Sequence, residues 1–222
     1  MLLEDEVFLV ELFNMWYGTK LRFERTKSED VSSLTKHTLP AAHIQNQWTN
    51  LWFAKGETQK QVDEMFQSQY LQLISRDLQY HPEHLNTIQQ LALIILYDQL
   101  SRNLFRRTAK AYAYDHKSRS LALGIIHNEG LYESLGLQYK LTLLICLLHS
   151  EDLPIQNLVS SHVAQLNENG ELQPHSALLV QLKHISNNHR ERVLNFGRIP
   201  ERNLYLGRPS TDSETAYLNA LK

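Results

Sequence analysis

A carboxylate and a guanidinium stand four residues apart near the end of the most apolar helical stretch of the chain. The stretch runs from Leu85 to Phe105, and Asp98 and Arg102 continue its hydrophobic stripe at the spacing of one helix face. Gln99 and Asn103 accompany them. Because buried charge is costly unless it is paired, two interpretations stay open. The pair is a structural tie, or Arg102 contacts an anionic ligand that Asp98 helps to position.

A second polar group, His149-Ser150-Glu151-Asp152, directly follows an apolar helix. Histidine is the side chain best suited to general acid–base catalysis near neutral pH, and a neighbouring carboxylate such as Glu151 can orient the ring of His149. The dipole of a helix also favours a histidine at the C-terminus without any catalytic role. Both interpretations are kept.

A third group lies near the C-terminal end of the chain. His189 falls on an apolar helical stripe, and Arg192 follows less than one turn later. A loop stiffened by glycine and proline then carries the remaining candidates, which are Arg198, Arg202, Asn203 and Arg208. Arginines in such a loop suit a carboxylate or phosphate ligand, and they equally suit loop carbonyls and acidic side chains of the protein itself.

Other chemistries have little support in the sequence. The eleven histidines form no His-Glu-x-x-His pattern, and a single cysteine, Cys146, lies in an apolar run that predicts a small buried group. The sequence also lacks a Gly-x-Ser-x-Gly elbow and a glycine-rich phosphate loop. We therefore predict no metal site, no serine nucleophile and no cofactor.

Composition favours a soluble helical protein. The 222 residues are 42% hydrophobic and 21% charged, with only 8 glycines and 6 prolines. A formal charge of -2 gives no drive toward nucleic acid or an anionic membrane, and the apolar runs are too short to cross a bilayer. The acidic start, Met1 to Glu6, does not resemble an export signal, so we expect a cytoplasmic protein. The oligomeric state stays open.

Hydrophobic periodicity predicts an all-α fold without strands. A helix should end at Gly18, and a single domain should span residues 1–222, with 19–40 as an irregular excursion. Further helices are expected at these ranges: 61–78, 82–105, 108–114, 118–127, 137–149, 154–166, 174–196, and a last one capped by Thr211 and Glu214. Their lengths favour antiparallel pairs in a tetratricopeptide-like array, although no strict repeat is visible.

Several of these segments together resemble the bacterial domain-of-unknown-function family 924. The residues that carry the resemblance are Trp52-Phe53, the stretch Leu91 to Phe105, His149 to Asp152, Phe196-Gly197-Arg198, Leu206-Gly207-Arg208 and Ser210-Thr211. The resemblance implies an all-helical, tetratricopeptide-like fold and no established activity. The terminal motif of the family usually reads Pro-His-Arg-Asn, whereas this chain has Glu201 in place of the histidine.

Two functional hypotheses follow from the residues. In the first, a polar cleft gathers the candidates of all three groups, the arginines hold a small anionic ligand, and the catalytic candidates Asp98, His149, Glu151 and His189 move a proton or orient the group that does. In the second, a tetratricopeptide-like scaffold binds an acidic peptide or partner protein with the same basic residues. Whether the protein is an enzyme stays open.

Overall fold

The computed structural model describes residues 2–24, 31–76 and 78–221. Its residues group into two compact units, each described here by itself. Unit 1 comprises Met1–Arg106 and Ala111–Cys146, and unit 2 comprises Arg107–Lys110 and Leu147–Lys222. The predicted single domain stays a prediction, because one domain can contain two such units.

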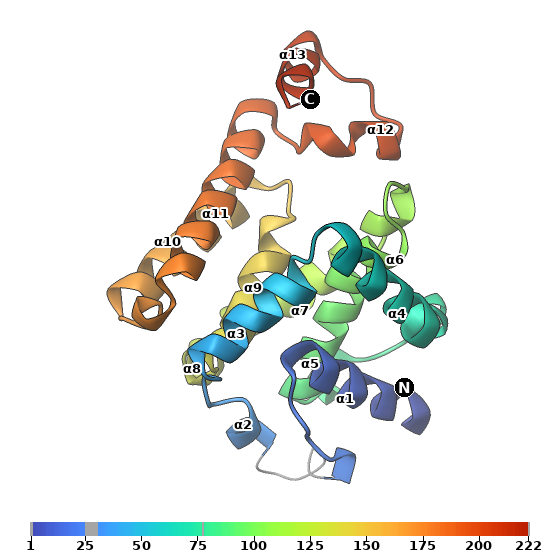
Figure 1. The fold of residues 1–222 in the computed structure, drawn as a ribbon, viewed down its shortest axis with the longest axis vertical. Coiled ribbons are helices and arrows are strands. Elements are labelled where there is room, and N and C mark those ends of the chain that lie inside the picture. Colours follow the sequence, from blue (N-terminus) through green and yellow to red (C-terminus); the bar gives the residue numbers. More distant parts are fainter. Residues whose placement is uncertain (1, 25–30, 77, 222) are drawn as a thin grey trace. The chain divides into compact units, whose positions relative to one another are not determined.

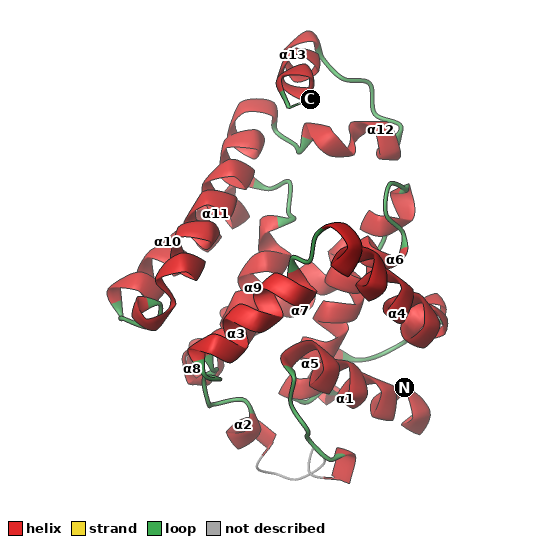
Figure 2. Ribbon diagram, in the orientation of Figure 1, coloured by secondary structure: helices red, strands yellow, loops and turns green. Residues whose placement is uncertain are grey.

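Helices make up nearly all the regular structure, and no strand occurs among the described residues (Figures 1 and 2). The all-α prediction is therefore confirmed. The α-helices are α1 (Leu3–Tyr17), α2 (Val31–Leu34), α3 (Ala41–Gln47), α4 (Gly56–Ser75), α5 (Thr87–Ile94), α6 (Ser101–Leu104), α7 (Asp115–Ile126), α8 (Glu129–Ser134), α9 (Leu137–Leu148), α10 (Leu153–Glu168), α11 (Ser176–Phe196), α12 (Asn203–Leu206) and α13 (Asp212–Ala220). Two π-helices, η2 (Trp48–Trp52) and η4 (Ile95–Leu100), and the 3-10 helices η3 (Pro82–His84), η5 (Ala109–Tyr112), η6 (Gln173–His175) and η7 (Pro200–Arg202) complete them.

The core of unit 1 surrounds the helix that the sequence predicts to be central. Helix α5 begins at a capping box, in which Asn86 Oδ1 accepts a hydrogen bond from Gln89 N at 3.0 Å and Gln89 Oε1 accepts one from Asn86 N at 3.0 Å. Its apolar side chains Ile88 and Leu91 to Ile94 are fully buried, and α1 and α7 both pack against it. Burial on several sides explains why this segment is apolar nearly all round.

The predicted helix Pro82–Phe105 is interrupted. A 3-10 turn replaces its start, and α5 gives way at Ile95 to the π-helix η4, after which α6 ends at Leu104. The hydrogen bonds of η4 span five residues, as from Ser101 N to Leu96 O. The strict three-and-four spacing of an α-helix therefore does not describe the turn that carries Asp98.

Unit 2 is built on the hairpin of α10 and α11, which lie side by side (Figure 1). Asp152 caps α10 and Pro154 stands in its first turn, so the proline starts this helix. Helix α11 ends at Gly197, whose φ of 69° lies in the left-handed region that glycine adopts without strain. This end agrees with the helix predicted over residues 174–196.

Capping and helix-ending residues also predict where the helices near the two termini of the chain end and begin. Helix α1 ends at Gly18 with a φ of 65°, as predicted. Helix α13 begins at Thr211, whose Oγ1 accepts a hydrogen bond from Glu214 N at 3.3 Å while Glu214 Oε2 accepts one from Thr211 N at 2.7 Å. This is the capping box expected from the sequence. Four α-helices fall outside every predicted range, namely α2, α3, α8 and α12. Of these, α8 begins at Asn128, whose Oδ1 accepts a hydrogen bond from Leu131 N at 3.2 Å.

The segment 19–40 is only partly irregular. Residues 25–30 lie outside the described part of the chain, and α2 interrupts the remainder. Its later residues pack on the start of α9, where Thr38 Oγ1 accepts a hydrogen bond from Leu137 N at 3.0 Å and Leu39 N donates one to Gln138 Oε1 at 3.1 Å. The expected tetratricopeptide-like pairing of helices stays a prediction. Among the described helices, none has the length and apolar character needed to cross a membrane.

Candidate functional site

In unit 1 the predicted Asp98–Arg102 pair forms and gains a third member, Asp115. The Nη1 atom of Arg102 lies 2.9 Å from Asp98 Oδ1, and its Nη1 and Nη2 atoms donate to the two carboxylate oxygens of Asp115 at 2.9 and 2.8 Å. Burial opposes the charge of Arg102, but the two carboxylates outweigh it and raise the pKa of the guanidinium. Both Nη atoms are thus committed within the protein, which favours the structural interpretation.

The two amides of this group are also engaged. Gln99 Nε2 donates to Asp98 Oδ2, and Asn103 Nδ2 donates to Asp63 Oδ1 on α4 at 2.8 Å. Cys146 is buried, and burial first, then the negative charge of Asp98, raises the pKa of its thiol well above the ordinary value. The thiol is therefore protonated at neutral pH, in agreement with the small buried group predicted from the sequence.

In unit 2 the two candidate histidines are neighbours. The rings of His149 and His189 lie edge to face, with centroids 6.0 Å apart and an interplanar angle of 66°. The Nδ1 atom of His189 lies 2.9 Å from the carbonyl oxygen of Ile185. Because a carbonyl can only accept a hydrogen bond, Nδ1 carries a proton, and Nε2 is the basic atom of the neutral ring.

Glu151 serves as the anchor of the C-terminal loop. Its carboxylate accepts hydrogen bonds from Ile199 N at 2.9 Å and from Arg208 Nη1 and Nη2 at 2.6 and 3.0 Å, while Arg202 Nη1 lies 3.9 Å away. Burial works against the ionised form, yet Arg208, the Ile199 amide and Arg202 together lower the pKa of Glu151. A carboxylate stabilised in this way is a poor proton acceptor at neutral pH.

The remaining loop residues hold one another. Arg198 forms a two-point pair with Glu214, with Nε–Oε1 at 2.6 Å and Nη2–Oε2 at 2.7 Å. Asn203 Oδ1 accepts a hydrogen bond from Arg208 Nε at 3.0 Å. Arg202 is buried with 8% exposure. The sequence left two interpretations open for these arginines, which were binding of an anionic ligand and contacts within the protein. The observed contacts favour the second interpretation.

Arg192 differs from the other arginines. Its Nε atom lies 2.6 Å from Tyr217 Oη and 2.6 Å from Glu201 Oε1, whereas its two Nη atoms donate to no group among the described residues. It lines a pocket of about 230 Å³ together with Asn188, Glu191, Asn195, Phe196, Tyr217 and Leu221. Arg192 is thus a predicted site residue that lines a pocket.

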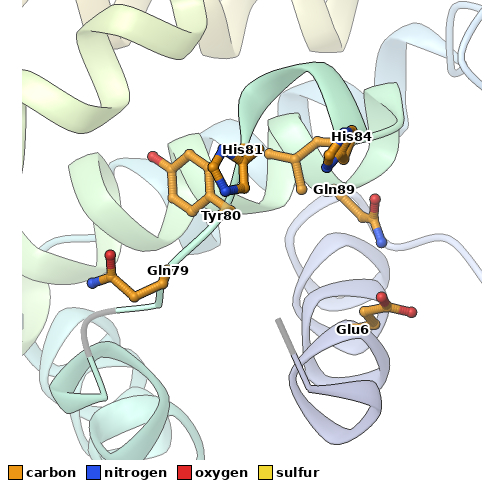
Figure 3. Close-up of a pocket in the computed structure, with 7 residues that line it drawn as sticks. Glu6, Gln79, Tyr80, His81, His84 and Gln89 are labelled. Atoms are coloured by element: carbon orange, nitrogen blue, oxygen red, sulfur yellow. The ribbon is translucent and has the colours of Figure 1, made fainter.

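A second pocket lies in unit 1 and was missed entirely by the sequence analysis. Its volume is about 390 Å³, and its lining comes from α1, the segment 79–85 and α5, as Figure 3 shows. The lining residues are Glu6, Gln79, Tyr80, His81, His84, Leu85 and Gln89. They are spread over more than eighty positions, so no local spacing could indicate that they share a surface.

The candidates therefore divide between the units. Unit 1 holds Asp98, Gln99, Arg102 and Asn103, and unit 2 holds His149, Glu151, His189, Arg192, Arg198, Arg202, Asn203 and Arg208. The sequence analysis did not identify the side chains that contact Arg102, Asn103, Arg192 and Arg198. These partners are Asp63, Asp115, Glu201, Glu214 and Tyr217. A cleft that gathers all the candidates stays a prediction.

The chain belongs to the family of bacterial proteins of unknown function DUF924, whose model matches residues 12–221. The resemblance noted from the sequence is thereby confirmed. Among solved structures, it is similar to the protein of unknown function ATU0120 from Agrobacterium tumefaciens, with 28% identity and a TM-score of 0.58. That match covers 80% of this chain and 96% of the other. Among curated proteins, none matches this chain.

Proposed function

We propose that unit 2 binds a small molecule that carries a carboxylate, in the pocket between α11 and α13. The observation that supports the proposal is the state of Arg192, which lines the pocket and whose Nη atoms donate to no group among the described residues. A guanidinium offers a carboxylate two parallel N–H donors, and such charge-assisted bonds are the strong ones. Arg192 is therefore the residue that we expect to hold the ligand.

The charges near Arg192 favour a carboxylate over a phosphate. Glu191 lines the same pocket, and Glu201 already contacts Arg192 through Nε. A dianionic phosphate would meet repulsion from both carboxylates with one guanidinium to offset it, whereas a carboxylate brings a single charge. Of the two ligand classes that the sequence left open, a carboxylate or a phosphate, we therefore expect a carboxylate.

The rest of the pocket suits a ligand with an apolar body. Phe196 and Tyr217 pack with ring centroids 5.1 Å apart, and Leu221 completes an apolar wall. Asn188 and Asn195 add neutral amides to the lining, and Nδ2 of Asn188 also lies 3.0 Å from His184 Nε2. At about 230 Å³ the space is below the roughly 300–1,000 Å³ usual for drug-sized ligands, so the acid should be small.

Titration calorimetry tests the proposal with benzoate and butyrate as probes and phenyl phosphate as the dianion. We expect benzoate to bind the wild type, and Arg192→Gln to weaken it about tenfold or more, the scale of a lost charged hydrogen bond. Arg190→Gln is the matched control, because Arg190 lies on the same helix and donates to Asn157 Oδ1 at 2.7 Å outside the pocket. Equal affinity in the Arg192 variant, or tighter binding of the phosphate, contradicts the proposal.

A second candidate function is the binding of a partner protein through its terminal carboxylate. Leu221 favours it, because this leucine lines the pocket and yet is 54% exposed, which leaves apolar surface for a longer chain to cover. A peptide ending in a free carboxylate should then bind more tightly than benzoate, and its amidated form should not bind. Equal binding of both forms rules this second function out.

The proposal assigns binding to this pocket and assigns no reaction. His149 and His189 stay the predicted acid–base groups of unit 2, with Nε2 of His189 as the basic atom of the neutral ring. The cytoplasmic location expected from the sequence is part of the same proposal, since small carboxylic acids are abundant metabolites there.

A further inference from the structure

The pocket between α11 and α13 in unit 2 holds a carboxylate as well as a guanidinium. Glu191 directly precedes Arg192 on α11, and both side chains line the pocket. Glu191 is exposed, and no described residue donates a hydrogen bond to its carboxylate or forms an ion pair with it. Arg192 forms its ion pair with Glu201 instead, through Nε at 2.6 Å. The pocket therefore presents one charge of each sign to a molecule that enters it.

A simple carboxylic acid satisfies only half of this arrangement. Its carboxylate can pair with the Nη atoms of Arg192, but it also brings a second negative charge close to Glu191. Like charges that share a small space repel each other. A ligand with an ammonium group beside its carboxylate replaces this repulsion by a second attraction, because the carboxylate of Glu191 accepts hydrogen bonds from the ammonium group. The charges of the pocket therefore favour a zwitterion.

The apolar part of the lining indicates where the two charges of the ligand should lie. The rings of Phe196 and Tyr217 pack with centroids 5.1 Å apart, and Leu221 is the third apolar member. The hydroxyl of Tyr217 is engaged, since it donates to Glu201 Oε1 at 3.1 Å and accepts from Arg192 Nε at 2.6 Å. A ligand with both charges on one carbon leaves its side chain to cover this wall, whereas an acid with its amine at the far end of the chain holds its alkyl part between the charges.

We propose that this pocket binds a free α-amino acid with an apolar side chain, an inference that rests on the carboxylate-binding function proposed above. Arg192 binds the α-carboxylate through its Nη atoms, and Glu191 pairs with the α-ammonium group. The side chain of the ligand lies against Phe196 and Tyr217. The volume of about 230 Å³ lies below the range of drug-sized sites, which suits a single amino acid.

Titration calorimetry on the full chain tests the proposal with L-leucine and two analogues. The first analogue, 4-methylpentanoate, keeps the carboxylate and the alkyl chain of leucine but lacks the ammonium group. The second, N-acetyl-L-leucine, replaces the ammonium group by a neutral amide and so imitates the end of a peptide. We expect leucine to bind about tenfold more tightly than either analogue, the scale of one charge-assisted hydrogen bond.

Glu191→Gln should remove this preference for leucine. The change keeps the size of an exposed side chain and removes its charge, so leucine should bind about tenfold more weakly while 4-methylpentanoate binds equally well or better. Arg192→Gln should weaken both ligands. Glu168→Gln is the matched control, because Glu168 is an exposed carboxylate on α10 of unit 2 that does not line the pocket. Its affinities should stay within about twofold of the wild type, and the melting temperatures of the Glu191 and Glu168 variants should agree.

The possible results separate this inference from the function on which it rests. If 4-methylpentanoate binds as tightly as leucine or more tightly, and its binding depends on Arg192, the carboxylate site stands and the amino acid is overturned. An unchanged affinity for leucine in Glu191→Gln overturns it as well, and equal or tighter binding of N-acetyl-L-leucine overturns it in favour of a peptide end. If leucine and 4-methylpentanoate both fail to bind, or bind Arg192→Gln as tightly as the wild type, the carboxylate site itself is wrong and the inference falls with it.

Discussion

Arg102 of unit 1 and Arg192 of unit 2 share one residue type and differ in what surrounds them. Arg102 meets two carboxylates and spends both Nη atoms on them, with a side chain only 17% exposed. Arg192 is similarly shielded, at 20% exposure, and its Cζ atom lies 5.9 Å from the centroid of the Tyr217 ring. Among the described residues, however, only its Nε atom donates a hydrogen bond. Burial therefore does not distinguish the two arginines, whereas the number of guanidinium N–H groups that are bonded within the described residues does, and the proposed ligand-binding role of Arg192 depends on this difference.

The largest effect should come from breaking the cluster around Arg102. Arg102→Met replaces the side chain by a shorter, uncharged and flexible one and leaves Asp98, which is 1% exposed, without this counter-charge. We expect a loss of about 3–5 kcal/mol in the free energy of unfolding, the usual cost of leaving a buried charge unpaired. Urea denaturation followed by circular dichroism measures it.

Arg106→Met is the control for this prediction. Arg106 also pairs with an aspartate, with Nε 2.6 Å from Asp63 Oδ2, but its side chain is 41% exposed. An exposed pair of this kind should contribute less than about 1 kcal/mol. Equal losses in the two variants would show that the loss at Arg102 does not come from leaving a buried carboxylate unpaired.

A smaller effect is expected at the anchor of the loop in unit 2. Glu151→Gln removes the charge that pairs with Arg208 and leaves Arg202 without the nearby carboxylate. The expected cost is about 1.5–3 kcal/mol, the range for hydrogen bonds to charged groups. Hydrogen exchange should show faster exchange of the Ile199 amide, which donates to Glu151.

The neighbouring acid provides the control for Glu151. Asp152 caps α10, and its Oδ1 atom accepts from Ile155 N at 3.4 Å. Asp152→Asn removes a charge from the same segment but retains a side chain that caps equally well, so stability should change by less than about 0.5 kcal/mol. If Asp152→Asn also speeds exchange of the Ile199 amide, the net charge of the segment and not the contacts of Glu151 stabilises the loop.

The features that could be predicted from the sequence are those set by residues close together along the chain. Gly18 and Gly197 end helices, Pro154 starts one, and Thr211 with Glu214 forms a capping box, because each of these signals acts within one helical turn. The contact between Asp98 and Arg102, predicted from their spacing of four, also forms, although Asp98 lies in the π-helix η4. The all-helical class rests on the same local periodicity.

The sequence could not reveal partners that tertiary packing supplies. Asp115 lies thirteen positions beyond Arg102, and Arg208 reaches Glu151 across fifty-seven positions, so no helical period connects them. The π-helix η4 was missed for another reason, since its apolar sequence is compatible with an ordinary α-helix. From the sequence, an arginine that pairs within the protein cannot be distinguished from one whose N–H groups are available to a ligand.

Acid should weaken unit 2 through Glu214. The guanidinium of Arg198 beside it lowers the pKa of this carboxyl from 4.5 to about 2. Since the folded-state pKa lies below that of the unfolded chain, the stabilisation is complete above about pH 4.5 and is lost progressively as the pH falls toward 2. Urea unfolding between pH 6 and pH 2.5 should show Glu214→Gln less stable at pH 6 and the difference shrinking toward pH 2.5. Asp212→Asn, an exposed change on the same helix, should leave the wild-type pH dependence intact.

The smallest effect on stability is expected at Arg192, where the comparison is sharpest. Arg192→Gln removes one contact to Tyr217 and one to Glu201, a residue whose side chain is 33% exposed. We expect less than about 1 kcal/mol in the free energy of unfolding, as for other partly exposed ion pairs. Urea denaturation of this variant beside Arg102→Met gives the direct measurement. A loss as large as that of Arg102→Met would show that Arg192 also holds the fold, and that its unused Nη atoms do not distinguish it.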